Sequence, residues 1–381
     1  MKIKFSNTFI KALIVIILVI IIDLLGFAFL VLRTVSIPFV PNRNIDEMSD
    51  YYTAVWESRN RYSVDNDRFA IIDITEYSRH QITDILSIVR DMKPKIIGLD
   101  VSYIHEENQA EDSLLVSTIQ SIPNIVLPVE YSDEEHGVPE FKPGIFHDRL
   151  NSKEYGVVSF PDNRDIIRNF RPTFYIDNNS IDAFSCVIAK KCGADISSLN
   201  NKRSITINYT TLKLTDDDVI PGFQFLNLNS RDSLALSSAI SDKIVLMGST
   251  HLTNDHHLTP LGTSASGIII HAHVINSLLE NKIIRTTPLV LRYILCFVIA
   301  VITLCWLKKN KLPQKANFRM WYRPIKWCVL FFISILLFAV IGTIIYSKCS
   351  YYIDFSPYIV ALILAHFIKD KTINLGKLCK K

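Results

Sequence analysis

Three aspartates stand where buried strands are expected to end. Asp73 closes the segment 68–74, Asp100 closes the segment 95–101, and Asp255 lies in the loop after a later strand. The carboxyl ends of parallel strands meet at one edge of a sheet, where ligands usually bind. Carboxylates there could coordinate a cation or hold a basic ligand. Alternatively, they cap helices and bond loop amides without meeting a ligand.

Histidines form a second group that could do chemistry, because zinc is commonly bound by histidine. The group comprises His251, His256, His257, His271 and His273. If 267–279 is a helix, His271 and His273 lie about 200° apart and cannot share one metal ion. The adjacent pair His256 and His257 would usually diverge. We therefore expect no metal site, and we expect His271 to be a buried residue that bonds the preceding loop.

Nucleophilic catalysis has no support in the sequence. There is no Gly-x-Ser-x-Gly elbow, no glycine-rich phosphate loop and no His-Glu-x-x-His motif. Ser249 with His251 as a base would be an unusual pair, because the two are only two residues apart at a strand end. We expect no catalytic residue and no enzymatic activity, and the sequence leaves any cofactor unknown.

The elements that position these residues alternate between strand and helix patterns. In the segment 77–92, for example, Ile82, Ile85, Leu86 and Val89 lie on one helical face. This alternation predicts an α/β domain with a mainly parallel or mixed sheet. The expected strands are 68–74, 95–101, 124–129, 156–160, 173–176, 204–209 and 243–248, and the expected helices are 77–92, 112–120, 181–192 and 267–279.

The chain is also rich in apolar residues, which make up 49% of it, and its mean hydropathy is +0.23. A helix needs about 20 apolar residues to cross a bilayer. Four segments approach this length, and we expect four transmembrane helices at 12–32, 289–307, 327–346 and 351–368. The first is expected to be an uncleaved signal anchor, because its apolar core exceeds the usual length of about 7–15 residues and no small-residue cleavage motif follows it.

Lysines and arginines predict the orientation of these spans. The leader 1–11, the loop 308–326 and the tail 369–381 hold fifteen of them and a single acid, so the intervening region 33–288 is acidic although the chain is +4 overall. We expect a multi-pass protein of the plasma (inner) membrane with both termini cytoplasmic and 33–288 extracytoplasmic. Anionic lipid explains the basic loop better than nucleic acid does.

Two polar residues lie within the expected spans. A carboxylate near mid-span costs about 2.5–3.5 kcal/mol on insertion scales, so Asp23 should face a partner or water. Arg292 enters the second span from the outer side and could reach Asp23. The alternative is a protonated Asp23 that bonds a neighbouring helix. Outside the spans, Cys186 and Cys192 face different sides of the helix 181–192, which argues for buried free thiols rather than a disulfide.

An ordered set of short motifs runs through the region between the first and second expected spans. The motifs are Ile71–Ile74 with Tyr77, Lys95–Asp100, Ile207-Asn208-Tyr209, Lys243–Gly248, Asp255, Thr259-Pro260, Gly267, His271-Ala272, Asn276 and Leu278-Leu279. Together they resemble the type-two CHASE family, a bacterial sensory extracellular domain associated with cyclases and histidine kinases. The resemblance implies a leading span, an outer sensory domain and usually three closing spans. It also implies that the matching motif residues are structural positions of that domain.

Two departures from the family pattern matter. Where the family has Asp-x-Asp-Gly-x-x-Arg, Asp162 and Arg168 match, but Arg164 and Asp165 replace the central acid and glycine. Arg168 stays a candidate ligand-binding residue beside the three aspartates. Family members usually continue into a cytoplasmic catalytic domain, and the 13-residue tail 369–381 is too short to hold one.

These features predict a sensory membrane protein that binds an extracytoplasmic ligand and signals through a separate membrane or cytoplasmic partner protein. One alternative is a structural or assembly protein of the cell envelope. Another is a metal-dependent envelope hydrolase that uses the acidic edge. The sequence names neither the ligand nor the partner, and it leaves a homo-oligomer open.

Overall fold

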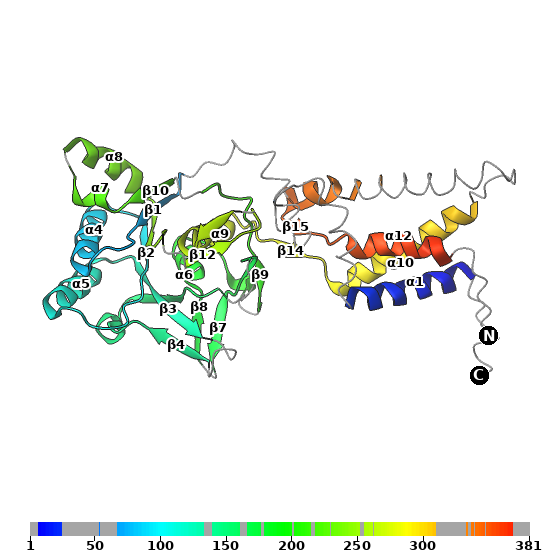
Figure 1. Cartoon of the computed structure of the whole chain (residues 1–381), viewed down its shortest axis with the longest axis horizontal. Coiled ribbons are helices and arrows are strands. Elements are labelled where there is room, and N and C mark those ends of the chain that lie inside the picture. The colour runs from blue at the N-terminus through cyan, green and yellow to red at the C-terminus, as the bar shows by residue number, and fades with distance from the viewer. Residues whose placement is uncertain are drawn as a thin grey trace. The chain divides into compact units, whose positions relative to one another are not determined.

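The computed structural model describes 7–24, 53, 67–132, 139–160, 166–176, 179–199, 202–214, 218–228, 230–251, 255–261, 263–309, 333, 337–338, 340–346 and 348–368. The chain forms two compact units (Figure 1). We call residues 57–284 the sheet unit. Residues 1–56 and 285–381 together make the helix unit.

A seven-stranded sheet forms the centre of the sheet unit. Its strands run parallel, except that β4 is antiparallel to its neighbour β3. Along the sheet the order is β10 (Val219–Pro221), β1 (Phe69–Asp73), β11 (Ile244–Gly248), β2 (Ile96–Asp100), β3 (Ile125–Ser132) and β4 (Glu140–Pro143), and β5 (Glu154–Val157) also pairs with β3. The predicted α/β fold with a mixed, mainly parallel sheet is confirmed.

Helices cover both faces of this sheet (Figure 1). On one face lie α4 (Arg79–Asp91), α5 (Gln109–Ser121), α7 (Phe223–Leu226) and α8 (Ser230–Ile240), and on the other lie α6 (Phe184–Lys191) and α9 (Gly267–Leu279). Neighbouring strand residues enter different cores, since Ile71 packs with α6 and α9 while Ile72 packs with α4. Strands that are buried on both faces explain the continuous apolar runs in the sequence.

Local sequence sets where the helices begin. Ser78 caps α4, accepting a hydrogen bond from the Gln81 amide, and the Gln81 side chain accepts in return from the Ser78 amide. This capping box starts the helix at Arg79, two residues later than predicted. Asn108 caps α5 in a similar way, with its Oδ1 3.0 Å from the Ala110 nitrogen.

Several predicted elements differ from the structure in their bounds. The helix predicted at 112–120 begins three residues earlier, as α5, and the strand predicted at 124–129 extends to Ser132, as β3. The helix predicted from 181 begins only at Phe184, because β8 (Asn179–Asp182) pairs with β7 (Thr173–Ile176) in a hairpin. The strand predicted at 156–160 lies earlier, as β5. The strand predicted at 204–209 shrinks to β9 (Ile205–Thr206), which pairs with β6 (Asn169–Phe170), because the Asn208 side chain holds the following residues in a turn.

Two glycines of the sheet are needed because a helix packs closely against the strands, and not because the chain turns there. A Cβ on Gly156 would lie 2.5 Å from the Phe184 Cα, and one on Gly98 would lie 2.6 Å from the Ile188 side chain. Both contacts are with α6, so these glycines let that helix lie directly on the strands. The thiol of Cys186 is buried in the same core and Cys192 is partly buried, and both are free cysteines.

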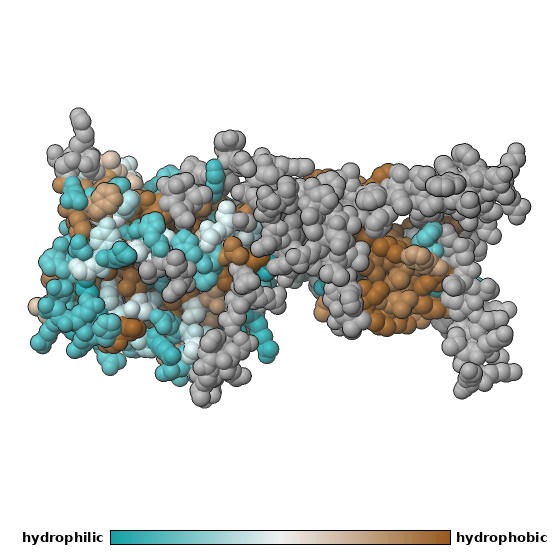
Figure 2. Space-filling model, viewed as in Figure 1, coloured by the Kyte–Doolittle hydropathy of each residue, from teal (hydrophilic) through white to brown (hydrophobic). Residues whose placement is uncertain are grey.

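In the helix unit, α1 (Asn7–Leu24), α10 (Leu289–Lys309) and α12 (Ser356–Ile368) pack against one another. Small residues such as Ala12, Ala300 and Ala361 are buried between them, which lets the backbones come close. Large apolar side chains of α1 and α10 are exposed, and Figure 2 shows the resulting apolar surface. Such a surface suits lipid.

Among the described residues, one helix is long and apolar enough to cross a membrane, Leu289–Leu307. The predicted spans 12–32 and 327–346 extend outside the described residues, and the four-span arrangement stays a prediction. The fourth span was predicted to begin at Tyr351, and this boundary is wrong because the helix begins at Ser356. Tyr351 and Tyr352 instead form β15, which pairs with β14 (Arg285–Thr286).

A polar network ties the three helices together. Arg292 of α10 places Nη1 3.5 Å from Asp23 Oδ2 of α1 and 3.4 Å from Asp354 Oδ2, just before α12. The Tyr293 hydroxyl donates to Asp23 at 2.8 Å. Asp354 accepts in turn from the Ser356 amide at 3.0 Å. The sequence indicated the pair of Asp23 and Arg292 but missed Tyr293 and Asp354.

Replacing Arg292 with leucine should therefore destabilise the helix unit. Two partly buried carboxylates would lose their shared cation, and an unsatisfied buried polar group costs about 1–3 kcal/mol. Unfolding of the purified full chain by dodecyl sulfate in mixed micelles would measure the loss. Lys348→Leu removes an exposed charge and should leave the midpoint unchanged. Equal midpoints for both variants would mean that the network adds no stability.

Candidate functional site

A cavity of about 560 Å³ lies at the carboxyl ends of β1, β2, β3 and β11. Its volume is within the range of about 300–1,000 Å³ that is typical of small-molecule sites. Five acids, two tyrosines and one arginine are among the residues that line it. The lining therefore holds more carboxyl groups than guanidinium groups. The acids are Glu76, Asp100, Glu107, Glu130 and Asp255, and the other three residues are Tyr77, Tyr103 and Arg79.

Asp100 is the acid of this cavity that ends strand β2. The parallel pairing aligns Asp73, Gly248 and Asp100 across three neighbouring strands. Gly248 gives Asp100 room, because a Cβ there would lie 3.3 Å from the Asp100 Cβ. Burial raises the pKa of Asp100 to about 7, and the nearby charges of Asp255 and Glu130 raise it further. Within the described part of the chain its carboxyl makes no hydrogen bond.

Asp255 joins the cavity to the start of α9. Its carboxylate accepts a hydrogen bond from the Gly267 amide, and a Cβ on Gly267 would lie only 2.8 Å from Asp255 Oδ1. The residue before the helix, Ser266, makes no capping bond with its own side chain. Burial raises the pKa of Asp255 to about 6, although His256 and the Gly267 amide pull it down. Asp255 thus serves as a helix cap and a cavity wall at once.

Asp73, the third predicted acid, does not line the cavity. It is 7% exposed, and it accepts hydrogen bonds from the Thr75 amide and the Thr250 amide, each at 3.1 Å. The Thr75 hydroxyl donates to the same oxygen at 2.5 Å. These contacts give Asp73 the loop-bonding role that the sequence left as the alternative.

Arg79 is a cavity residue that sequence reasoning missed. Only 4% exposed, it pairs with Asp112 of α5, bonds the His105 carbonyl and lies 3.5 Å from Glu107. Its guanidinium also sits 5.2 Å from the centre of the Tyr103 ring. The sequence did contain a signal for this ion pair. Arg79 and Asp112 each place a charged side chain near the start of a predicted helix, on the face that should be buried.

Two polar groups of this wall have no hydrogen-bond partner among the described residues. They are Arg79 Nε and the Tyr103 hydroxyl, and both atoms are buried. Burial raises the pKa of Tyr103, so its hydroxyl stays protonated. A buried donor without a partner costs free energy, and such groups in a native structure often mark a binding position.

Arg168, the remaining ligand candidate, is 3% exposed and does not line the cavity. Its carbonyl accepts a hydrogen bond from the Ile207 amide at 2.8 Å. The remodelled motif residues Asp162, Arg164 and Asp165 lie outside the described residues.

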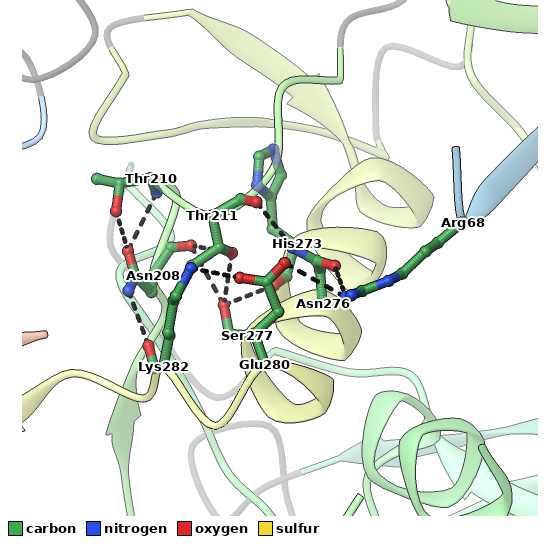
Figure 3. A network of polar contacts seen from close by, with 9 residues as sticks. All are labelled: Arg68, Asn208, Thr210, Thr211, His273, Asn276, Ser277, Glu280 and Lys282. Atoms are coloured by element: carbon green, nitrogen blue, oxygen red, sulfur yellow. Dashed lines mark hydrogen bonds and ion pairs between the residues drawn. The ribbon is translucent and has the colours of Figure 1, made fainter. Parts of the chain in front are cut away.

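Several motif residues form a structural network at the other end of α9 (Figure 3). Asn208 donates to the Lys282 carbonyl at 2.7 Å and accepts from the Thr210 amide at 3.1 Å. Asn276 donates to the Thr211 carbonyl at 2.8 Å and accepts from Arg68 at 3.2 Å. The network fastens the end of α9 to the turn after β9 and to the start of β1.

Three further motif residues, Tyr209, His271 and Thr259, are also buried among protein atoms. Tyr209 donates to the Ile167 carbonyl at 2.8 Å and lies 5.0 Å from the His273 ring. His271 Nδ1 lies 2.7 Å from the Ser185 hydroxyl. Thr259, which precedes Pro260, bonds the Thr263 carbonyl through its amide and its hydroxyl.

Burial lowers the pKa of both helix histidines, His271 to about 3 and His273 to about 4, so both are neutral at pH 7. His271 bonds Ser185 of another helix, α6. His273, on the other side of the same helix, is only 1% exposed. Within the described residues, no three His, Cys, Asp or Glu side chains lie close enough together to hold a metal ion.

Asp100→Asn should stabilise the sheet unit at alkaline pH. Because the folded pKa of Asp100 is raised from 3.8 to about 7, its stabilising contribution is full below pH 3.8 and is lost as the pH rises through 7. Asparagine removes the cost of burying the charge, so the melting temperature at pH 8 should rise by about 2–4 °C per kcal/mol recovered.

Calorimetry of the full chain in detergent at pH 8 and near pH 4 would test this. The gain should vanish near pH 4, where the wild-type carboxyl is largely protonated. Glu106→Gln changes an exposed acid outside the cavity and should leave both melting temperatures unchanged. A lower melting temperature for Asp100→Asn at pH 8 would show that the carboxylate stabilises the fold.

Comparison with known proteins places these observations in a family. A model of the CHASE2 domain matches residues 24–307, which covers the whole sheet unit and reaches into α10. No curated protein and no solved structure matches the chain. CHASE2 domains are extracellular sensory domains that are associated with membranes. The match confirms the resemblance of the ordered motifs, and the chain belongs to the CHASE2 family.

Proposed function

We propose that this chain is a membrane receptor that binds a small extracytoplasmic ligand in the Asp100 cavity and reports it to a separate partner protein. The observation that carries the proposal is the partly buried Asp100 carboxyl, which lines the cavity, has a raised pKa and makes no hydrogen bond within the described residues. Strongly perturbed acids in a cleft are typical of functional sites. The position at the carboxyl edge of a parallel sheet supports the same assignment.

The route from the cavity to the membrane follows α9. Asp255 lines the cavity and caps the first residue of this helix, while Asn276 and Ser277 fasten its far end. The chain then continues from Leu279 to the start of α10 at Leu289. A ligand that draws Asp255 away from the Gly267 amide would change how this helix is held. Signalling requires only that the ligand prefer one of the two arrangements.

In the topology that we propose, four spans cross the plasma membrane, both termini are cytoplasmic and residues 33–288 are extracytoplasmic. The distribution of lysine and arginine supports this orientation, since the three basic segments would all lie inside. The exposed apolar side chains of α1 and α10 support insertion of these helices in lipid.

Fusion of an alkaline phosphatase reporter, which is active only outside the cytoplasm, would test the topology. Reporter activity should be high for a fusion at Asp133 and absent for fusions at Lys315 and Lys381. A cytoplasmic reporter at the same three positions should give the opposite pattern. Similar phosphatase activity at Asp133 and Lys315 would contradict the proposed orientation.

Blocking the cavity would test the sensory role. Ser102 lines the cavity, so Ser102→Trp should fill part of it and hold the sheet unit in one state. A photo-crosslinker placed at Lys315 would report contacts of the inner loop in living cells. The yield of the main cross-linked partner should differ between Ser102→Trp and wild type.

The matched control is Ser113→Trp, which puts the same side chain on an exposed position of α5. It should give the wild-type cross-linking yield. If Ser102→Trp is folded, inserted and cross-linked like the control, the cavity is not the sensing site.

A further inference from the structure

We propose that the cavity binds a small organic amine, whose ammonium group is held by Asp100, with Glu130 and Asp255 adding negative charge to the lining, and whose neutral oxygen meets the wall of Arg79 and Tyr103. This inference rests on the proposed function and names the ligand class of the same site. An amino alcohol or an amino sugar has the required pair of groups.

The charge of the lining favours an ammonium group. Asp100, Asp255 and Glu130 all line the cavity, and the negative charges of Asp255 and Glu130 raise the pKa of Asp100. The one arginine of the lining does not offset them, because Arg79 is paired with Asp112 and lies beside Glu107. An ammonium group would relieve this repulsion and give the Asp100 carboxyl charge-assisted hydrogen bonds.

A second observation concerns the wall that carries Arg79. This side chain is 4% exposed, it lines the cavity, and its Nε–H has no hydrogen-bond acceptor among the described residues. The buried Tyr103 hydroxyl beside it is likewise without a partner there. Both atoms are covered by protein, so they can donate a hydrogen bond to a ligand only when this wall moves. Because Asp112 and Glu107 already balance the Arg79 charge, a neutral hydroxyl fits this wall better than a third carboxylate.

The same lining argues for an amine rather than a metal ion. No three His, Cys, Asp or Glu side chains of the described residues converge as metal ligands would. The rings of Tyr77 and Tyr103 line the cavity, and aromatic faces attract organic cations. A volume of about 560 Å³ also exceeds what one hydrated ion requires.

Amine binding should depend on pH because Asp100 must be ionised to attract the cation. Burial and two neighbouring acids raise its pKa to about 7, so affinity should increase as the pH rises from 5.5 to 8. The other ionisable groups of the cavity are Asp255, Glu130, Glu76, Glu107, Arg79 and His105. Ionisation of Asp255, with its pKa at about 6, acts in the same direction.

Calorimetric titration of the full chain in lipid nanodiscs would test the inference with two matched pairs of probes. Ethanolamine is compared with ethylene glycol, and glucamine with sorbitol, so that each pair differs in one amine. At pH 8 at least one amine should bind about tenfold or more tightly than its neutral counterpart. This is the difference in affinity that one charge-assisted hydrogen bond typically provides. At pH 5.5 the advantage should shrink.

Two cavity variants and one control locate the effect. Asp100→Asn should abolish the preference for the amine, Glu130→Gln should reduce it, and Glu106→Gln, outside the cavity, should keep it. The inference fails if neither amine binds better than its counterpart, or if the preference survives in Asp100→Asn. It also fails if calcium chloride binds at this site and displaces the amine.

These results separate the ligand class from the sensory role. If Ser102→Trp alters cross-linking while no amine binds, the cavity senses a ligand of another class. If amines bind through Asp100 while Ser102→Trp leaves cross-linking unchanged, the amine site stands and the sensory role falls.

Discussion

The parallel register of β1, β11 and β2 is the constraint on which the rest of the sheet unit depends. It aligns Asp73, Gly248 and Asp100 at one edge, with a glycine between two acids. The glycine between them leaves space for both side chains. Asp73 points into the loops and Asp100 lines the cavity. Asp73 accepts hydrogen bonds from loop amides through one of its oxygens, whereas Asp100 keeps a desolvated carboxyl.

Much of the sheet unit could be predicted from the sequence because hydrophobic periodicity is a local signal. The strands at 68–74, 95–101 and 243–248 and the helix at 267–279 were placed within one residue at either end. Errors arose where side chains override periodicity, as in the hairpin that delays α6 and the Asn208 turn that shortens β9.

The cavity was harder to predict. The order of the strands predicted which edge of the sheet holds the cavity. The residues that line the cavity depended on the direction that each side chain takes after the end of its strand. Nothing in the spacing distinguished Asp73 from Asp100, because both close buried strands. Arg79 and Glu130 escaped notice since they reach the cavity from a helix start and from a third strand, which only tertiary structure brings together.

Asp255 has a consequence for how such a receptor could change over time. One carboxylate serves as a wall of the cavity and as the cap of α9, and it fits against the helix start because Gly267 has no side chain. In the receptor that we propose, a substitution of Asp255 that suits a new ligand would therefore also change how the start of α9 is held. Affinity and signal strength would be coupled through a single side chain, so diversification of the binding preference would have to come from the other walls, around Arg79, Tyr103 and Glu130.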